Sequence, residues 1–356
     1  MLRIRGGRKT NYAYAAARVQ ARRSKLIPES EYEKLLKMDL SEITRYIEDS
    51  AYKAEVDELS GRFRGLDLLE AALTVNQERA NAAVRRMVDG EGGALVVLWL
   101  QRFLVENLKA VLRGKQSGAG REELLKELLL EDLDSFSVFQ PLLADDVRSP
   151  EEVTAVLERQ GTVGADWARV LGRVPPDAGL SAYEDALDKA YFAQLVENLE
   201  QSGQRGSDLM LDFVRSEIDA TNLQNAARWV VSGQGGDFSP YVVPGGRLVR
   251  VADAMALSRR SDLAELTEGV AELGLPASLH DALREGARVG RLAPFQAALR
   301  HWHFEQLDRL GHKAPLSIVP ILLYLARKHR EVLRLRALAR GRAAGLSEER
   351  LRELVA

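Results

Sequence analysis

The heptapeptide NLKAVLR, residues Asn107–Arg113, recurs twice further along the chain and organises the whole sequence. It returns 115 residues later as NLQNAAR, Asn222–Arg228, and another 112 residues later as RLRALAR, Arg334–Arg340. A five-residue motif precedes these copies by 38, 39 and 39 residues: LEAAL at 69–73, YEDAL at 183–187 and FQAAL at 295–299. Two motifs in three copies with matched spacing indicate an internal structural repeat.

Each copy predicts two long helices joined by a short break. The breaks fall near Gly90–Gly92, Ser202–Gly206 and Gly311–Pro315. Two capping boxes are predicted to begin further helices, one at Ser149–Glu152 and one at Ser181 with Glu184. The fold class predicted is therefore all-α.

One mid-chain loop, Ser232–Arg250, interrupts this helical pattern. Strand signals are scarce, and only Tyr241–Val243 inside the loop reads as extended before it enters Pro244-Gly245-Gly246.

The repeat predicts three similar helical modules, covering residues 1–90, 91–203 and 204–311. The chain begins and ends inside the repeating pattern. We therefore expect the C-terminal helices, residues 312–356, to pack on the first module and complete it. Three such modules are expected to close into a pseudo-threefold funnel or ring.

Composition excludes several classes of function. The 356 residues carry a net charge of −2, with 46% hydrophobic and 29% charged residues, a soluble balance without a global basic field. The absence of cysteine excludes disulfides, thiolate catalysis and cysteine-ligated metals. No apolar run reaches the roughly 20 residues that a membrane span needs, and none follows the basic N-terminus MLRIRGGRKT. We expect neither membrane insertion nor a signal peptide.

Catalytic motifs are also missing. Gly114-Lys115 lacks the surrounding pattern of a phosphate-binding loop, and the glycine cluster 233–236 follows a predicted helix rather than a strand. His301 and His303 are two residues apart in a predicted helix, so they point in different directions and do not form a metal site. The sequence predicts a protein that is not an enzyme and has no catalytic residue, cofactor or metal.

The stretch 327–342 holds seven arginine and lysine residues against Glu331 alone. It permits three interpretations: a solvated helical face with Leu325, Val332, Leu335 and Ala339 packed inward, a surface for an acidic patch on a partner or on a neighbouring module, or a nucleic-acid-binding helix.

Several stretches together carry a family resemblance that covers nearly the whole chain. They are Tyr12–Leu26, Tyr32–Asp39, Ser41–Ile47, Ala186–Phe192, Pro244–Leu248 and Pro315–Leu354. On these residues the chain resembles the C subunit of the archaeal and bacterial A/V-type rotary ATP synthases, and it is similar to the d subunit of the vacuolar ATPase. Arg334 departs from the repeat, because the first two copies have asparagine there.

This resemblance implies a non-catalytic central-stalk subunit. One copy would act as a socket in a hetero-oligomeric complex, peripheral on the cytoplasmic face of the cell membrane. It would couple the rotating central shaft to the membrane proteolipid rotor ring, with no nucleic acid as partner. Two alternatives stay open: a helical-repeat scaffold for other proteins, or a nucleic-acid-binding protein that uses the basic stretch 327–342.

Arg113, Arg228 and Arg340 are the candidate interface residues, because they share one position in the three seven-residue motifs. Near the C-terminal end of a helix, an arginine complements the negative end of the dipole by ~0.3–1 kcal/mol. The alternative is that the three together present a positive ring to a partner on the module axis.

Overall fold

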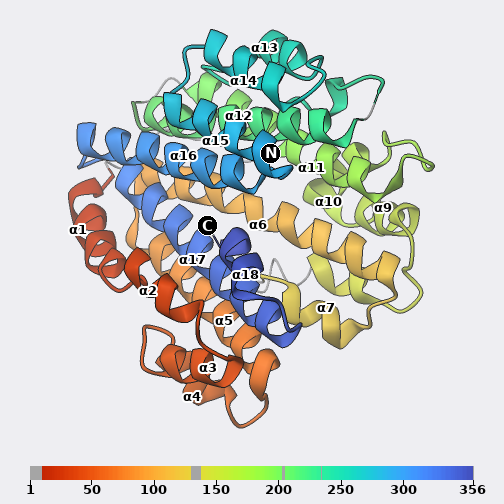
Figure 1. Ribbon diagram of the computed structural model, residues 1–356. Helices are drawn as coiled ribbons and strands as arrows, with labels where there is room; N and C mark the ends of the chain where they lie inside the picture. The colour runs from red at the N-terminus through yellow and green to blue at the C-terminus, as the bar shows by residue number, and fades with distance from the viewer. Residues whose placement is uncertain (1–9, 130–137, 203–204, 234, 356) are drawn as a thin grey trace. The chain divides into compact units, whose positions relative to one another are not determined.

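The computed structural model describes residues 10–129, 138–202, 205–233 and 235–355. The basic residues 1–9 and Gln234 of the glycine cluster lie outside this range. Within it the chain is helical and contains no strand, which confirms the all-α prediction (Figure 1). The chain divides into two compact units, Met1–Leu187 with Leu316–Ala356, and Asp188–Pro315.

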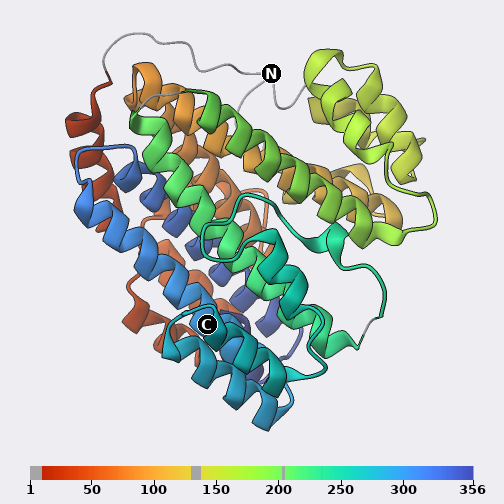
Figure 2. The same ribbon diagram turned by 90° about the horizontal axis from the view of Figure 1, so that it is seen from above.

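Each repeat copy contains the predicted pair of long helices. The pairs are α5 (Gly65–Met87) with α6 (Gly90–Ser117), α11 (Gly179–Ser202) with α12 (Arg205–Ser232), and α16 (Ala293–Lys313) with α17 (Val319–Ala343). In every pair the five-residue motif lies in the first helix and the seven-residue motif in the second. Figure 2 draws the long helices of the chain from a second direction.

Shorter helices complete the first unit. They are α1 (Tyr12–Arg23), α2 (Glu29–Leu35), α3 (Leu40–Glu48), α4 (Lys53–Leu59), α7 (Arg121–Glu127), the 3₁₀ turn η1 (Gln140–Leu143), α9 (Pro150–Glu158), α10 (Gly161–Leu171) and α18 (Glu348–Val355). The second unit adds η2 (Ser239–Tyr241), α13 (Val251–Leu257), α14 (Leu263–Glu272) and α15 (Ala277–Val289).

The core of the first unit joins the two ends of the chain. Helix α17 packs on α5, α1 and α3, and α18 packs on α17. Leu69 and Leu73 share one buried cluster with Leu335 and Leu338. The last helices therefore bury their apolar face against the first hundred residues, the main favourable term for holding both ends together. The boundaries of the three modules stay a prediction.

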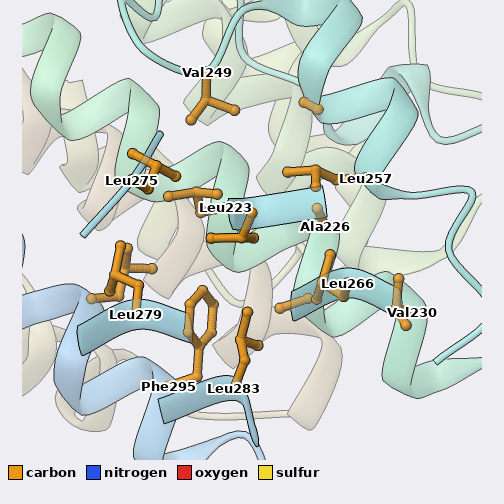
Figure 3. Close-up of a cluster of buried hydrophobic side chains, with 14 of the residues drawn as sticks. Leu223, Ala226, Val230, Val249, Leu257, Leu266, Leu275, Leu279, Leu283 and Phe295 are labelled. Atoms are coloured by element: carbon orange, nitrogen blue, oxygen red, sulfur yellow. The ribbon is translucent and has the colours of Figure 1, made fainter. Parts of the chain in front are cut away.

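The core of the second unit lies between α12, the short helices α13 to α15 and the long helix α16 (Figure 3). Leu223 and Ala226 of α12 face Leu266, Leu279 and Phe295, all nearly inaccessible to solvent. This cluster fixes α12 and α16 beside one another.

Two local predictions have different outcomes. The capping box at Ser149 is confirmed, because its hydroxyl accepts from the Glu152 N–H at 3.2 Å while Glu152 Oε2 accepts from the Ser149 N–H at 3.0 Å. The box at Ser181 is wrong: α11 begins two residues earlier, at Gly179, so Ser181 and Glu184 lie inside the helix. The Glu184 carboxylate is directed to another helix instead.

Candidate functional site: the arginines of the repeated motif

Arg113, Arg228 and Arg340 lie within five residues of the C-terminal ends of α6, α12 and α17. All three residues are exposed. Only Arg340 lies in the last turn of its helix, where a cation is stabilised by the exposed carbonyl groups. Arg113 and Arg228 lie one residue further from the helix end, outside the last turn of α6 and α12.

Arg113 forms an ion pair with Glu184 of α11. Its Nε donates to Glu184 Oε1 at 2.5 Å, and the side chains are 52% and 24% exposed. Partial burial lowers the pKa of Arg113, but the hydrogen bond to Glu184 and the charges of Glu184, Glu106 and Glu127 together outweigh that effect and leave the pKa raised. The guanidinium stays charged, and much of its surface remains open to solvent.

Arg340 forms the corresponding contact in the third copy. Its Nε donates to Glu70 Oε1 of α5, and its Nη2 donates to Glu127 Oε1 at 3.1 Å. These hydrogen bonds, led by the one to Glu70, raise the pKa of Arg340. The Glu70 side chain is only 11% exposed, so the arginine neutralises a carboxylate that has lost most of its hydration.

The two glutamates occupy the same place in the repeat. Glu70 and Glu184 are both the second residue of a five-residue motif. The arginine of the first copy thus pairs with the glutamate of the second, and the arginine of the third copy with the glutamate of the first. The position corresponding to these glutamates for Arg228 is Gln296, which is half-buried on α16. Sequence reasoning did not single out the glutamates, although their matching positions were visible.

The asparagine that begins the first two seven-residue motifs is buried and hydrogen-bonds both backbone groups of one downstream residue. We call this arrangement the asparagine clamp. Asn107 Nδ2 donates to the Leu129 carbonyl at 2.7 Å, and its Oδ1 accepts from the Leu129 N–H at 2.8 Å. Asn222 makes the same pair of contacts with Val243, both at 2.9 Å. Each amide satisfies one backbone donor and one acceptor that the chain buries 21 or 22 residues downstream. The clamp is the second site feature that the sequence analysis missed.

Asp219, one turn before Asn222, holds the next part of the same loop. Its carboxylate accepts from the Leu248 N–H at 3.0 Å and the Val249 N–H at 2.8 Å. Burial raises the pKa of Asp219, while these N–H groups act in the opposite direction. A methyl group on Gly246 would come within 2.5 Å of the Val249 carbonyl oxygen, so the close approach requires glycine.

The third copy replaces the asparagine by Arg334, and the partner changes with it. Its two Nη atoms donate to the two Glu29 carboxylate oxygens at 2.7 and 2.6 Å, and its guanidinium lies 3.5 Å from the Tyr32 ring centroid. An arginine fork suits a carboxylate in this bidentate geometry. The third helix pair is thereby joined to α2 near the start of the chain.

The basic stretch 327–342 is mostly turned into the first unit. Lys328 and Arg334 are buried, Arg336 donates to Thr74 Oγ1 at 2.9 Å, and Arg342 donates to the Leu36 carbonyl. The interpretation as a solvated face is therefore wrong for most of its cations, because intramolecular acceptors lie opposite them. The predicted inward packing of Leu325, Val332, Leu335 and Ala339 is confirmed.

A buried charged group lies at the centre of this stretch. Lys328 Nζ donates to Tyr52 Oη at 2.7 Å and to Glu331 Oε1 at 2.9 Å, and the Tyr52 hydroxyl donates to the same oxygen at 2.7 Å. Burial, followed by the Glu331 charge, raises the pKa of Tyr52 well above its usual value. Burial lowers the pKa of Lys328, although Glu331 opposes that shift. These groups hold α17 against the Tyr52 turn.

The two neighbouring histidines have separate partners. His301 lies 3.3 Å from Glu305 and is largely exposed, whereas His303 Nδ1 lies 3.2 Å from Ser216 Oγ. Among the residues with described positions, no three potential metal ligands come together. Within the same ranges, no helix has both the length and the apolarity needed to cross a lipid bilayer.

The repeated polar side chains of this all-helical chain thus bind one another and the backbone. The sequence matches the ATP synthase (C/AC39) subunit family over residues 15–354, and the chain belongs to that family. It is 36% identical over 342 residues to the A-type ATP synthase C subunit of Haloferax volcanii, with 96% of both chains covered. It is 30% identical over 354 residues to the A-type ATP synthase C subunit of Methanosarcina mazei, with 97% of this chain and 92% of the relative covered.

Proposed function

We propose that this chain is a non-catalytic central-stalk subunit of an A/V-type rotary ATP synthase. In this role it is the socket that couples the rotating shaft to the proteolipid ring, peripheral on the cytoplasmic face of the membrane. The observation that carries the proposal is the family match from residue 15 to residue 354, together with A-type ATP synthase relatives that align over nearly their full length.

The polar chemistry of the described residues supports a coupling role over a catalytic one. Arg113, Arg334 and Arg340 bind carboxylates, and Asn107 and Asn222 bind backbone groups. Side chains committed to such contacts stiffen a protein but offer no nucleophile or proton acceptor to a substrate.

The proposed arrangement is three modules, 1–90 with 312–356, 91–203 and 204–311, closed into a pseudo-threefold ring. The Arg340–Glu70 contact supports the return of the C-terminal helices to the first module, because Arg340 lies in 312–356 and Glu70 in 1–90. The Arg113–Glu184 contact lies inside the module 91–203 and joins its two long helices.

Arg113, Arg228 and Arg340 remain the proposed contact points for a partner on the ring axis. The side chains of Arg113 and Arg340 are still 52% and 45% exposed while paired, so each can receive a further carboxylate. Charges arranged this way would orient an acidic partner before contact.

The test is affinity purification of the tagged chain from membranes solubilised in mild detergent. We expect recovery of shaft and proteolipid subunits. Replacement of the three arginines by glutamine should weaken that recovery more than tenfold, about 1.4 kcal/mol, and the loss should shrink at high salt. The matched control replaces the exposed Arg159, Arg173 and Arg259 by glutamine, with the same charge change.

Two results would contradict the proposal. Recovery of unrelated proteins without rotor subunits favours the scaffold alternative, and recovery of RNA favours nucleic-acid binding. Unchanged rotor recovery by the triple variant would keep the subunit role but assign the arginines to intramolecular stabilisation alone.

A further inference from the structure

A cleft of about 430 Å³ lies in the first unit, between α1 and the turn that joins α5 to α6. Its polar lining includes Asn11, Tyr14, Arg18 and Arg22 from the N-terminal segment, and Arg86 and Asp89 from the turn region. Cavities of roughly 300–1,000 Å³ hold small molecules in other proteins. The cleft is therefore large enough for a small anion or a lipid headgroup.

Helical spacing sets one wall of the cleft. Tyr14, Arg18 and Arg22 are four residues apart on α1, so they line one face of that helix. The Arg18 guanidinium lies 5.9 Å from the Tyr14 ring centroid, and Arg22 hydrogen-bonds Tyr324 of α17. These contacts orient the two guanidinium groups.

Asn11 ties this wall to the opposite one. Its Nδ2 donates to the Met87 carbonyl at 3.0 Å, and its Oδ1 accepts from the Asp89 N–H at 3.1 Å. Both walls of the cleft are thus held together by backbone contacts at one end. A site of fixed width is preorganised for a ligand and loses less entropy on binding.

The charge in the cleft is unbalanced. Three arginines line it, against the single carboxylate of Asp89. Over the described parts of the chain, neither Arg18 nor Arg86 has an ion pair, whereas Arg113, Arg334 and Arg340 each bind a glutamate. Cations gathered without counter-charges repel one another, and an anion between them would remove that repulsion.

We propose that this cleft binds a phosphoryl group, either free phosphate or the phosphate of an anionic lipid headgroup. A guanidinium fork matches phosphate oxygens in bidentate geometry, and a phosphoryl group offers enough oxygens for more than one fork. A single carboxylate has only two oxygens and one charge, so it would satisfy fewer of the three arginines. The site lies outside the three repeated arginines, and its existence does not depend on the proposed coupling function.

The test compares the full-length chain with the Arg18→Gln/Arg86→Gln variant. Arg23→Gln is the matched control, because it removes a charge from α1 at a residue outside the cleft lining. Calorimetric titration with sodium phosphate at constant ionic strength should show binding to the wild type and control. The double variant should bind at least tenfold more weakly, since it lacks two of the three guanidinium groups that would donate charged hydrogen bonds to the phosphoryl oxygens.

Thermal unfolding separates this site from general salt effects. Phosphate stabilises most proteins by exclusion from their surface, and that part of the melting-temperature increase should persist in the double variant. Only the wild type and control should show the additional increase that saturates with binding. The apo double variant should melt no lower than wild type, because it loses repulsion and no ion pair.

A second arm distinguishes the two sources of phosphate. Sedimentation with phosphatidylglycerol vesicles should carry down the wild type but not the double variant if a headgroup is the ligand. Binding of sodium phosphate in the calorimeter without binding to the vesicles would identify free phosphate as the ligand. Equal behaviour of wild type and double variant in both assays would overturn the proposal, and would leave the cleft to an acidic protein segment instead.

Discussion

Arg340, near the end of α17, forms an ion pair with Glu70 of α5, 270 positions earlier in the chain. Arg113 and Glu184 stand in the same relation one copy further on. The arginine of one repeat copy therefore pairs with the glutamate of the next in two cases, from the first copy to the second and from the last copy to the first.

Removing this contact should destabilise the first unit. Arg340→Gln leaves the poorly exposed Glu70 carboxylate without its main partner, so we expect a loss of about 1–2 kcal/mol in unfolding free energy. That exceeds the ~0–1 kcal/mol typical of exposed pairs.

Urea unfolding of Arg340→Gln, Glu70→Gln and the double variant measures the coupling energy between the two side chains. The control cycle uses Lys53 and Asp57, an exposed pair on α4 whose coupling should be near zero. Additive effects of the two substitutions at 70 and 340 would refute the pairing.

An acid at position 296 should strengthen the second unit. Gln296→Glu places a carboxylate on α16 at the position that Glu70 and Glu184 occupy in the other copies. We expect a gain of about 0.3–1 kcal/mol, the range of a partly exposed pair. The gain should fall in 1 M salt and disappear in an Arg228→Gln background. Gln296→Leu controls for the loss of the amide. A salt-independent gain would show that Arg228 takes no part.

The asparagine clamp at Asn222 should stabilise the mid-chain loop. Asn222→Leu leaves the Val243 N–H and carbonyl buried without partners, which costs about 1–3 kcal/mol. Hydrogen exchange of residues 238–250 should accelerate more than that of α14 and α15. Asn225→Leu is the graded control, because Asn225 makes one contact, to the Tyr241 carbonyl at 2.9 Å. Equal hydrogen-exchange rates in both variants would show that the two contacts of Asn222 with Val243 do not determine the stability of the loop.

Alkaline pH should lower the unfolding free energy of the first unit. The raised pKa of Tyr52 means that its contribution to stability is complete below the usual value of 10.0 and is lost as the pH rises above it. Tyr12 acts in the same direction, because burial followed by the charge of Glu91 raises its pKa to about 12. Lys328 and Lys115 oppose them, since burial lowers the pKa of both and favours the folded state as the pH approaches 10.5. Six tyrosines with raised pKa values against two such lysines lead us to expect a net loss of stability.

The measurement is urea stability from pH 8 to about pH 11, with tyrosinate absorbance recorded in parallel. The decline above about pH 10 should be shallower in Tyr52→Phe. A variant whose stability declines as steeply as the wild type would exclude Tyr52 as a source of the pH dependence.

Local sequence spacing was sufficient for much of this fold. Repeat copies, helix pairs and the Ser149 cap depend on residues within about 40 positions, where helical periodicity and capping chemistry act directly. The same spacing identified Arg113, Arg228 and Arg340 as equivalent. Glu70 and Glu184 carried an equally regular signal, but nothing in one linear sequence states that an arginine of one copy meets the glutamate of another.

The sequence by itself determined the all-helical class, the repeat and the family resemblance, because these depend on the order of neighbouring residues. Only the tertiary structure decided what the charged residues contact. The stretch 327–342 has the composition of an exposed basic surface, yet Glu29 and Glu70 lie opposite Arg334 and Arg340 once α17 packs beside the first helices. Partners some 300 positions apart meet only when burial of the apolar face of α17 brings both chain ends together, and that burial is a property of the whole fold.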